Sequence, residues 1–348
     1  MPLFLHRIRQ GFPSRFLGAL AIALGFVIFL AVDQQHWWRL KPDYAFGWLV
    51  PVFVVYLVAD RWAALRALFQ GAGRSPLPGW LRAAVSAAAA LCFGTGLAFF
   101  LLGAAYRAAS GVTQPGSLAL AIGFSGVLLG MIYFNAPDGC VRSASIADGR
   151  GASADMGVLA SLRSDARLRV SALFLFPALI WVLSAPLASA IENAVSLFLL
   201  QKVVAVVFTV FNLLGYTLVR EGNVLVLPHG QVGVADACSG IRSLTGCLFA
   251  GSFLAAVFLD RLWKKVLLVV AAMGLAFFTN LLRSLFLTAW AYAYGSDAIE
   301  GPLHDGTGFA VLGLTCVGLF CLLPLFSGKN WRSWLGLDPE KGDHRIHL

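Results

Sequence analysis

Three short motifs carry side chains of types that could act together in one reaction. Cys238 stands in ACSGIR, Arg283 ends NLLR, and His304 stands in GPLHDG. A thiolate is the nucleophile of cysteine catalysis, an imidazole can accept and return its proton, and a guanidinium can stabilise an oxyanion through several donors. These residue types therefore predict acyl-transfer chemistry, provided that the fold brings the three motifs to one place.

The elements that must position them are apolar helices. Of the 348 residues, 59% are hydrophobic and only 12% are charged, and the mean hydropathy is +0.79. Runs of about 20 apolar residues cross a bilayer as helices, because backbone polar groups in lipid must be satisfied within the segment. The sequence predicts an all-α, polytopic transmembrane bundle. The candidate spans are 16–32, 45–59, 83–105, 118–134, 170–190, 243–259, 266–289 and 308–326, with a further apolar stretch at 196–218.

The basic residues set the predicted orientation. They gather in short connections at 7–15, 61–82, 142–169, 261–265 and 329–332, which are expected to be cytoplasmic. This use accounts for the net charge of +9 without a nucleic-acid partner. The apolar run after the first basic residues is read as an uncleaved span, because no small-residue cleavage site follows it.

The stretch 196–218 is the uncertain element of this topology. Only one net crossing fits between residue 190 and the basic block at 261–265. Gln201, Thr209, Asn212 and Tyr216 fall within one arc of a helix, of about 80° at 100° per residue. We therefore expect eight spans, with 196–218 as an interfacial or re-entrant amphipathic helix. The alternative is nine spans, with the polar stripe facing other helices.

This topology brings the three motifs to the outer face. Cys238 precedes the span 243–259, Arg283 lies near the outer end of 266–289, and His304 lies in the outer loop that follows. A helix start and the nearby Arg242 favour the ionised thiol of Cys238. Asn280, one turn before Arg283, could orient it or donate as well. The alternation around NVLVLPHGQVGV predicts a short hairpin-like excursion between Arg220 and Asp236 on the same face.

Each candidate also has an ordinary structural explanation. Cys238 could be a packing residue at a span end, and Arg283 could extend to the outer headgroups. His304 could be a loop histidine followed by Asp305 as a helix N-cap. His229, nine residues before Cys238, is a second candidate base.

No cofactor or metal site is expected. The six cysteines form no CxxC pair and show no Cys/His ligand spacing, so neither a metal nor a disulfide framework is indicated. The Gly/Ser/Ala/Asp-rich segment 139–168 is predicted to be a cytoplasmic connection without chemistry.

The motifs resemble those of the exosortase/archaeosortase family of membrane transpeptidases. ADACSGIRSL, NLLRSL and GPLHDGTGF follow one another in the family's order. KPDYAFGWLVPV at 41–52 is similar to its N-terminal motif, and REGNVLVLP to its approach to the cysteine. The resemblance covers most of residues 41–326. One departure is Ala45 and Phe46, where a Ser-His pair is common.

The resemblance implies an enzyme of the bacterial or archaeal cytoplasmic membrane. Its substrates would be membrane-anchored proteins with a C-terminal sorting signal of the PEP-CTERM kind, cut at the extracytoplasmic face through a thioester and transferred to a surface acceptor. Cys238 would be the nucleophile, Arg283 the transition-state stabiliser and His304 the acid/base. One integral membrane domain would cover 1–328, with its Cys/Arg/His core in 220–326, and 329–348 would be a short cytoplasmic tail.

Two other classes of function remain open at the level of sequence. A transporter or lipid- or polysaccharide-handling protein could bind an anion through Arg283 and Lys202, without need of Cys238. A non-catalytic assembly factor for surface polymers would tolerate replacement of all three residues.

Overall fold

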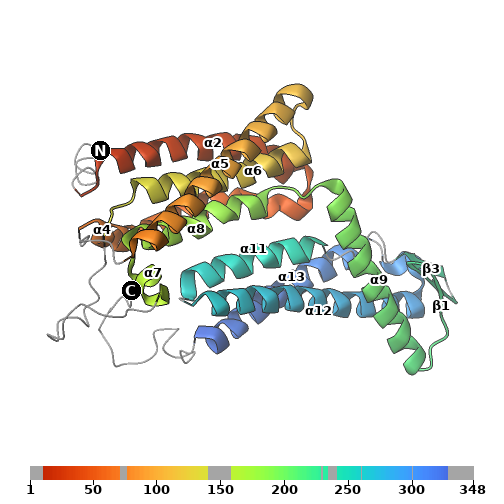
Figure 1. The fold of residues 1–348 in the computed structure, drawn as a ribbon. Coiled ribbons are helices and arrows are strands. Elements are labelled where there is room, and N and C mark those ends of the chain that lie inside the picture. The colour runs from red at the N-terminus through yellow and green to blue at the C-terminus, as the bar shows by residue number, and fades with distance from the viewer. Residues whose placement is uncertain are drawn as a thin grey trace. The chain divides into compact units, whose positions relative to one another are not determined.

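The computed structural model describes residues 11–70, 77–139, 158–228, 230–233, 241–259, 261–299 and 301–327. The chain divides into two compact units (Figure 1). The N-terminal unit contains the described residues up to Leu40 and from Gly47 to Pro186. The C-terminal unit contains Lys41–Phe46 and the described residues from Leu187 onward. The predicted tail 329–348 lies outside the described residues.

The described elements are helical apart from one small sheet. In chain order, the N-terminal unit contains α2 (Ser14–Leu40), α3 (Val50–Asp60), α4 (Trp62–Gln70), α5 (Gly79–Ser110), α6 (Gln114–Asn135), α7 (Val158–Ser164) and α8 (Ala166–Ser184), and the 3-10 helix η1 (Pro42–Leu49) runs from one unit into the other. The C-terminal unit adds α9 (Ser189–Leu213), β1 (Val219–Glu221), β2 (Val224–Leu227), β3 (Gly230–Gly233), α11 (Ile241–Phe258), α12 (Leu262–Tyr294), η3 (Ser296–Ile299) and α13 (Pro302–Ser327).

The predicted polytopic helical bundle is confirmed. Within the described ranges, nine helical segments are long and apolar enough to cross a membrane, and each of the apolar stretches named from the sequence corresponds to one of them. Large apolar side chains such as Leu101, Leu213 and Leu325 are exposed on helix surfaces, as expected where lipid replaces water. The chain is an integral membrane protein.

Glycines allow the closest helix packing in the N-terminal unit, between α5 and α6. A Cβ atom at Gly96 would lie 2.7–2.8 Å from backbone atoms of Gly126 and Val127, and one at Gly123 would lie 2.3 Å from the Phe100 nitrogen. Since side chains cannot occupy this space, the two backbones meet directly, as in small-residue interfaces of membrane helices.

A buried ion pair joins α2 to α5 in the same unit. The Asp33 side chain is only 1% exposed and pairs with Arg107, whose side chain is 31% exposed. The neighbouring Gln34 accepts a hydrogen bond from Ser184 Oγ at 2.6 Å and donates to the Trp181 carbonyl at 3.0 Å. A carboxylate within an apolar helix is costly unless it is paired, so these contacts fix the packing of α2.

Helix α9 satisfies the length and apolar character of a span, but it crosses α12 at a steep angle (Figure 1). Leu200, Val203 and Val207 are buried on one side of α9. Gln201, Thr209 and Asn212 are exposed, whereas Tyr216 lies beyond the end of α9 and its ring packs 5.0 Å from that of Tyr292 in α12. The interfacial placement of α9 stays a prediction, which the steep crossing and the exposed polar side chains support.

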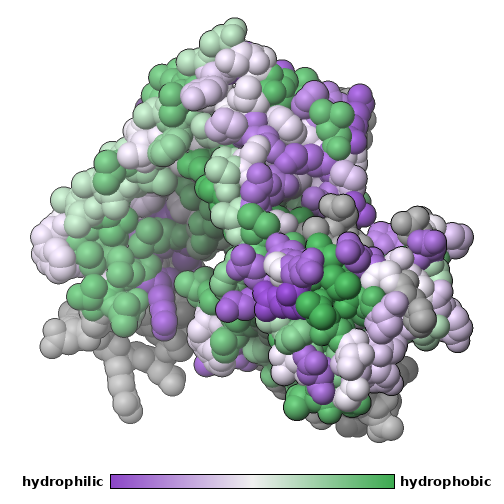
Figure 2. All heavy atoms as spheres, turned by 90° about the vertical axis from the view of Figure 1, so that its right-hand side faces the viewer, coloured by the Kyte–Doolittle hydropathy of each residue, from purple (hydrophilic) through white to green (hydrophobic). Residues whose placement is uncertain are grey.

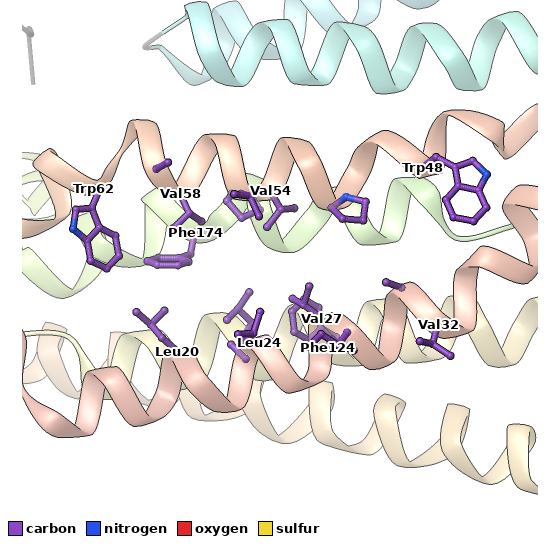
Figure 3. Close-up of a pocket in the computed structure, with 18 of the residues that line it drawn as sticks. Leu20, Leu24, Val27, Val32, Trp48, Val54, Val58, Trp62, Phe124 and Phe174 are labelled. Carbon is purple, nitrogen blue, oxygen red and sulfur yellow. The ribbon is translucent and has the colours of Figure 1, made fainter. Parts of the chain in front are cut away.

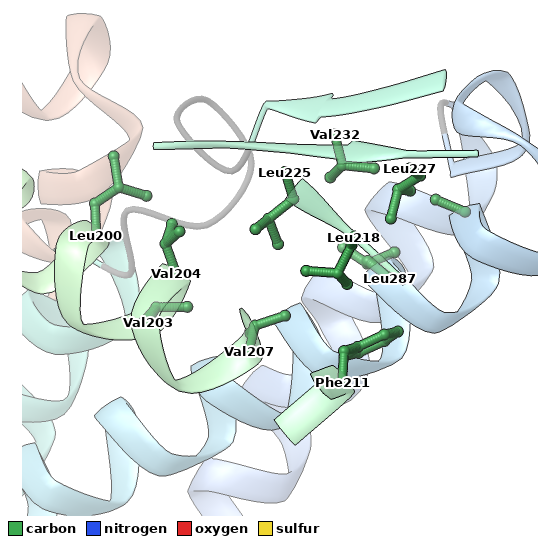
Figure 4. Packing of buried hydrophobic residues seen from close by; sticks show 11 residues of the cluster. Leu200, Val203, Val204, Val207, Phe211, Leu218, Leu225, Leu227, Val232 and Leu287 are labelled. Carbon is green, nitrogen blue, oxygen red and sulfur yellow. The ribbon is translucent and has the colours of Figure 1, made fainter. Parts of the chain in front are cut away.

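The sheet and α9 form a core with α12 (Figure 4). β1, β2 and β3 pair antiparallel in sequence order, with Val219 opposite Val226 and Leu225 opposite Val232. Leu225, Leu227 and Val232 are buried with Phe211 of α9 and Leu287 of α12. The hairpin-like excursion predicted from the alternation is therefore confirmed, with a third strand added. Figure 2 shows hydrophilic patches between hydrophobic ones at the end of the molecule that carries this sheet.

Candidate active site

Arg283 and His304 lie in direct contact where α12 and α13 pack together. Arg283 Nη2 is 3.0 Å from His304 Nε2 and donates to the His304 carbonyl oxygen at 3.2 Å. Both side chains are half-buried. A guanidinium has no acceptor, so Nε2 must accept this hydrogen bond and the proton of a neutral ring resides on Nδ1. The sequence prediction that α12 and α13 bring these two residues together agrees with this geometry.

Thr307 completes the arrangement and was not among the residues predicted from the sequence. Its hydroxyl donates to the His304 carbonyl at 2.8 Å and accepts from Arg283 Nε at 3.4 Å. Gly308 follows, and a Cβ atom at that position would lie 3.8 Å from Arg283 Nη2. Thr307 and Gly308 stand three and four residues after the histidine in GPLHDGTGF. Residues three and four apart on a helix share a face, so this signal was visible in the sequence.

The beginning of α13 differs from the expectation. His304 was predicted to lie in an outer loop, and Asp305 to cap the following helix. Instead α13 begins at Pro302, so His304 and Asp305 both lie in its first turn and the N-cap assignment for Asp305 is wrong. Proline at the first helical position explains the earlier start, because its fixed φ suits a helix and its missing N–H would be unpaired there in any case.

Asn280 lies one turn before Arg283, as expected. Asn280 is buried, at 3% exposure, and its backbone carbonyl oxygen accepts a hydrogen bond from Ser284 Oγ at 3.0 Å. Thr279, the residue before Asn280, shares a hydrogen bond of 2.9 Å with Thr315 and so links α12 to α13. The role of Asn280 in orienting Arg283 stays a prediction.

Packing contacts place the start of α11 at the level of this pair. Gly251 of α11 packs against Ala272 of the antiparallel α12. Ten residues back along α11 is Ile241, and ten residues onward along α12 is Leu282, about 15 Å in each helix at 1.5 Å per residue. The first residue of α11 is therefore level with the neighbour of Arg283.

Helices α11 and α13 also pack together in this unit. Cys247 and Leu254 of α11 are buried in one apolar cluster with Leu319 and Leu323 of α13. The packing of α11 against α12 therefore brings the beginning of α11 to the end of the bundle where Arg283 and His304 meet.

Residues from the N-terminal motif brace the first turns of α11. Asp43 Oδ1 accepts from Arg242 Nε at 3.1 Å, and its carbonyl oxygen accepts from Thr245 Oγ1 at 2.9 Å. The Phe46 ring lies 4.6 Å from that of Phe249. Arg242, predicted to assist the thiolate of Cys238, is 70% exposed in its side chain and is bound by this carboxylate. The partnership of Asp43 with Arg242 was not foreseen.

Tyr44 anchors the same segment to the chain after α8. It is 2% exposed, and its hydroxyl accepts a hydrogen bond from the Leu187 N–H at 3.0 Å. Lys41 pairs with Glu192 in the first turn of α9. The departure at Ala45 and Phe46 is thus accommodated by aromatic packing, since Phe46 contacts α11.

Cys238 and the rival base His229 both lie outside the described residues. Cys238 stands three residues before Ile241 in the sequence. Among the described residues, no group of three or more His, Cys, Asp or Glu side chains could hold a metal ion.

Comparison with known proteins identifies the family. A family model described as transmembrane exosortase matches residues 37–321, a segment that contains the braced Asp43, the Cys238 motif, Arg283 and His304. No curated protein and no solved structure gives a significant match. The model covers far more than half of the 348 residues, and the resemblance noted from the motifs is confirmed. This chain belongs to the transmembrane exosortase family.

Proposed function

We propose that this exosortase is a cysteine-dependent transpeptidase that cuts C-terminal sorting signals of exported, membrane-anchored proteins at the extracytoplasmic face. The observation that carries the proposal is the contact of 3.0 Å between Arg283 Nη2 and His304 Nε2, at the level where α11 begins. Cys238 would act from three residues before that helix. The site would then be drawn from one membrane domain, residues 1–328.

The reaction follows from the chemistry of these groups. Cys238 Sγ attacks the scissile carbonyl carbon while its proton passes to Nε2 of His304, which then gives up the hydrogen bond that it accepts from Arg283. The oxyanion that forms is stabilised by the N–H groups of Arg283. When the C–N bond breaks, His304 returns the proton to the leaving amine and a thioester remains on Cys238. An acceptor nucleophile then attacks the thioester and restores the thiol.

Arg283 suits the stabilising role because His304 and Thr307 hold its guanidinium in one orientation. Preorganised donors cost no reorganisation when charge develops. The same contacts weigh against an anion transporter that would use Arg283 with Lys202, since the Lys202 side chain is exposed and its ammonium lies 5.4 Å from the Phe198 ring on its own helix.

The decisive experiment is processing of a co-expressed substrate that ends in a Pro-Glu-Pro motif, an apolar span and a basic tail. Size shift and terminal mass would be compared for wild type, Cys238→Ala, Arg283→Ala and His304→Ala at equal membrane levels. Cys316→Ala, an exposed cysteine on α13, is the matched control. Loss of processing in the three site variants alone supports the proposal.

A thioester also predicts a chemical trap. Hydroxylamine added during processing should release the substrate as a hydroxamate, detected by mass at its new C-terminus. Normal processing by Cys238→Ala would contradict the assignment of Cys238 as the nucleophile. Loss with Arg283→Ala but not with Cys238→Ala would favour the anion-binding function.

A further inference from the structure

A long apolar groove opens on the N-terminal unit between α2 and α3. Its volume is about 1070 Å³. Leu20, Leu24 and Val27 of α2 face Val54 and Val58 of α3 across it, and Phe124 lies at its base (Figure 3). From Leu20 to Gln35 it follows α2 for about 22 Å, at 1.5 Å per residue.

Tryptophans mark the two ends of this α2–α3 groove. Trp62 lies at one end and Trp48 at the other (Figure 3), and the Trp38 ring lies 5.4 Å from that of Trp48. Tryptophan concentrates at the two membrane interfaces, because its ring is amphipathic. The groove therefore runs along the membrane normal through the hydrocarbon layer.

One cation stands at the Trp62 end. Of the described residues that line the groove, Arg66 alone carries a charge. Its Nε atom is buried and has no hydrogen-bond partner in the described part of the chain. Nearby Arg61 differs, because it donates to the Leu173 carbonyl at 2.6 Å. A buried donor without an acceptor is unfavourable, so an acceptor group bound at this end of the groove would stabilise Arg66 Nε.

We propose that the α2–α3 groove binds an anionic phospholipid, with its acyl chains between α2 and α3 and its phosphate on Arg66. The basic connection 61–82 is predicted to be cytoplasmic, which assigns the lipid to the inner leaflet. Lipid phosphate supplies the acceptor that Arg66 lacks, and the apolar walls match acyl chains. The inference is independent of the proposed peptidase function.

Size and charge both disfavour a substrate helix in this groove. A 20-residue helix about 30 Å long and 10 Å across occupies roughly 2400 Å³, more than twice the volume available. A sorting signal also ends in a basic tail, which Arg66 would repel at the cytoplasmic end. A flexible acyl chain meets neither obstacle.

The test is native mass spectrometry of the full chain after reconstitution in equal amounts of phosphatidylglycerol and phosphatidylcholine and re-extraction in mild detergent. We expect wild type to retain phosphatidylglycerol in preference to phosphatidylcholine. Arg66→Gln should reduce that preference about fivefold, the loss for one cation beside an anionic headgroup, and Arg66→Lys should restore part of it. Arg82→Gln, an exposed arginine of the same connection, should leave it unchanged.

A second pair of variants tests the groove itself. Val54→Trp fills the space between the helices and should abolish retention of both lipids. Val52→Trp, on an exposed position of α3 outside the groove, should not. An unchanged lipid preference in Arg66→Gln, or full lipid retention in Val54→Trp, overturns the proposal. If wild type instead carries a second protein copy and Val54→Trp loses it, the groove is a dimer interface and the lipid proposal is wrong.

Discussion

Thr307 offers the sharpest test of the site, because its hydroxyl touches both Arg283 and His304 without being placed to react. Thr307→Val keeps the shape of the side chain and removes both hydrogen bonds, at 3.4 Å and 2.8 Å. Of the contacts described above, Arg283 would keep those that Nη2 makes with His304 Nε2 and with the His304 carbonyl oxygen. The guanidinium could rotate about these remaining contacts.

The expected loss follows from the lengths of these bonds. A hydrogen bond to a charged group contributes about 1.5–3 kcal/mol, and 3.4 Å is long for such a bond, so the lower figure applies. About 1.4 kcal/mol corresponds to a tenfold change in rate. We therefore expect a roughly tenfold lower kcat with KM nearly unchanged, because the orientation of Arg283 matters most in the transition state.

The assay is the initial rate of substrate cleavage in proteoliposomes over a range of substrate densities. Thr307→Ser should recover most of the rate, since it keeps the hydroxyl. Thr315→Val is the matched control, because it removes the 2.9 Å bond to Thr279 between the same two helices and should lower stability without lowering kcat. Equal kcat losses in both valine variants, or none in Thr307→Val, would refute the positioning of Arg283 by Thr307.

Three further changes test the framework. Asp43→Ala removes the carboxylate that braces the first turn of α11. Because the ion pair is exposed, the free energy of unfolding should change by less than about 1 kcal/mol, while the rate of substrate processing falls. Unchanged processing would contradict the role of Asp43 in positioning α11. Arg107→Met leaves the buried Asp33 carboxylate without its ion-pair partner and should cost about 3–5 kcal/mol, seen as a lower Tm that the added change Asp33→Leu partly restores. Gly96→Ala forces α5 and α6 apart and should lower Tm well below that of Gly94→Ala, where a Cβ meets no atom within 4 Å; equal Tm values would argue against the close packing.

Much of the site could be predicted from sequence because its signals are local. NLLR within an apolar helix and GPLHDG before the next one indicate an arginine and a histidine at neighbouring helix ends, since a short connection forces α12 and α13 to pack antiparallel. In the structure α13 begins at Pro302, six residues before the predicted span 308–326, and His304 lies within its first turn. That boundary depends on a single proline, which apolar run lengths do not detect.

Contacts between distant segments had no comparable signal. Asp43 and Arg242 are separated by 199 positions, and nothing in either local pattern names the other. Asp33 directly follows the predicted span 16–32, and no local pattern indicates Arg107 as its partner, although this pairing is what makes a carboxylate tolerable there.

The sequence by itself determined that the chain is a polytopic helical membrane protein, and it named Cys238, Arg283 and His304 as the residues expected to carry its chemistry. The length of the apolar runs is enough to predict the membrane bundle, because few backbone structures satisfy their hydrogen bonds in lipid. Residue type is enough to name the three candidates. Only the tertiary structure decided that Arg283 is oriented by Thr307, that the segment at 43–46 braces α11, and that a groove ends at Arg66. Those features depend on distances between side chains of different helices, which are set by packing and not by any periodicity along the chain.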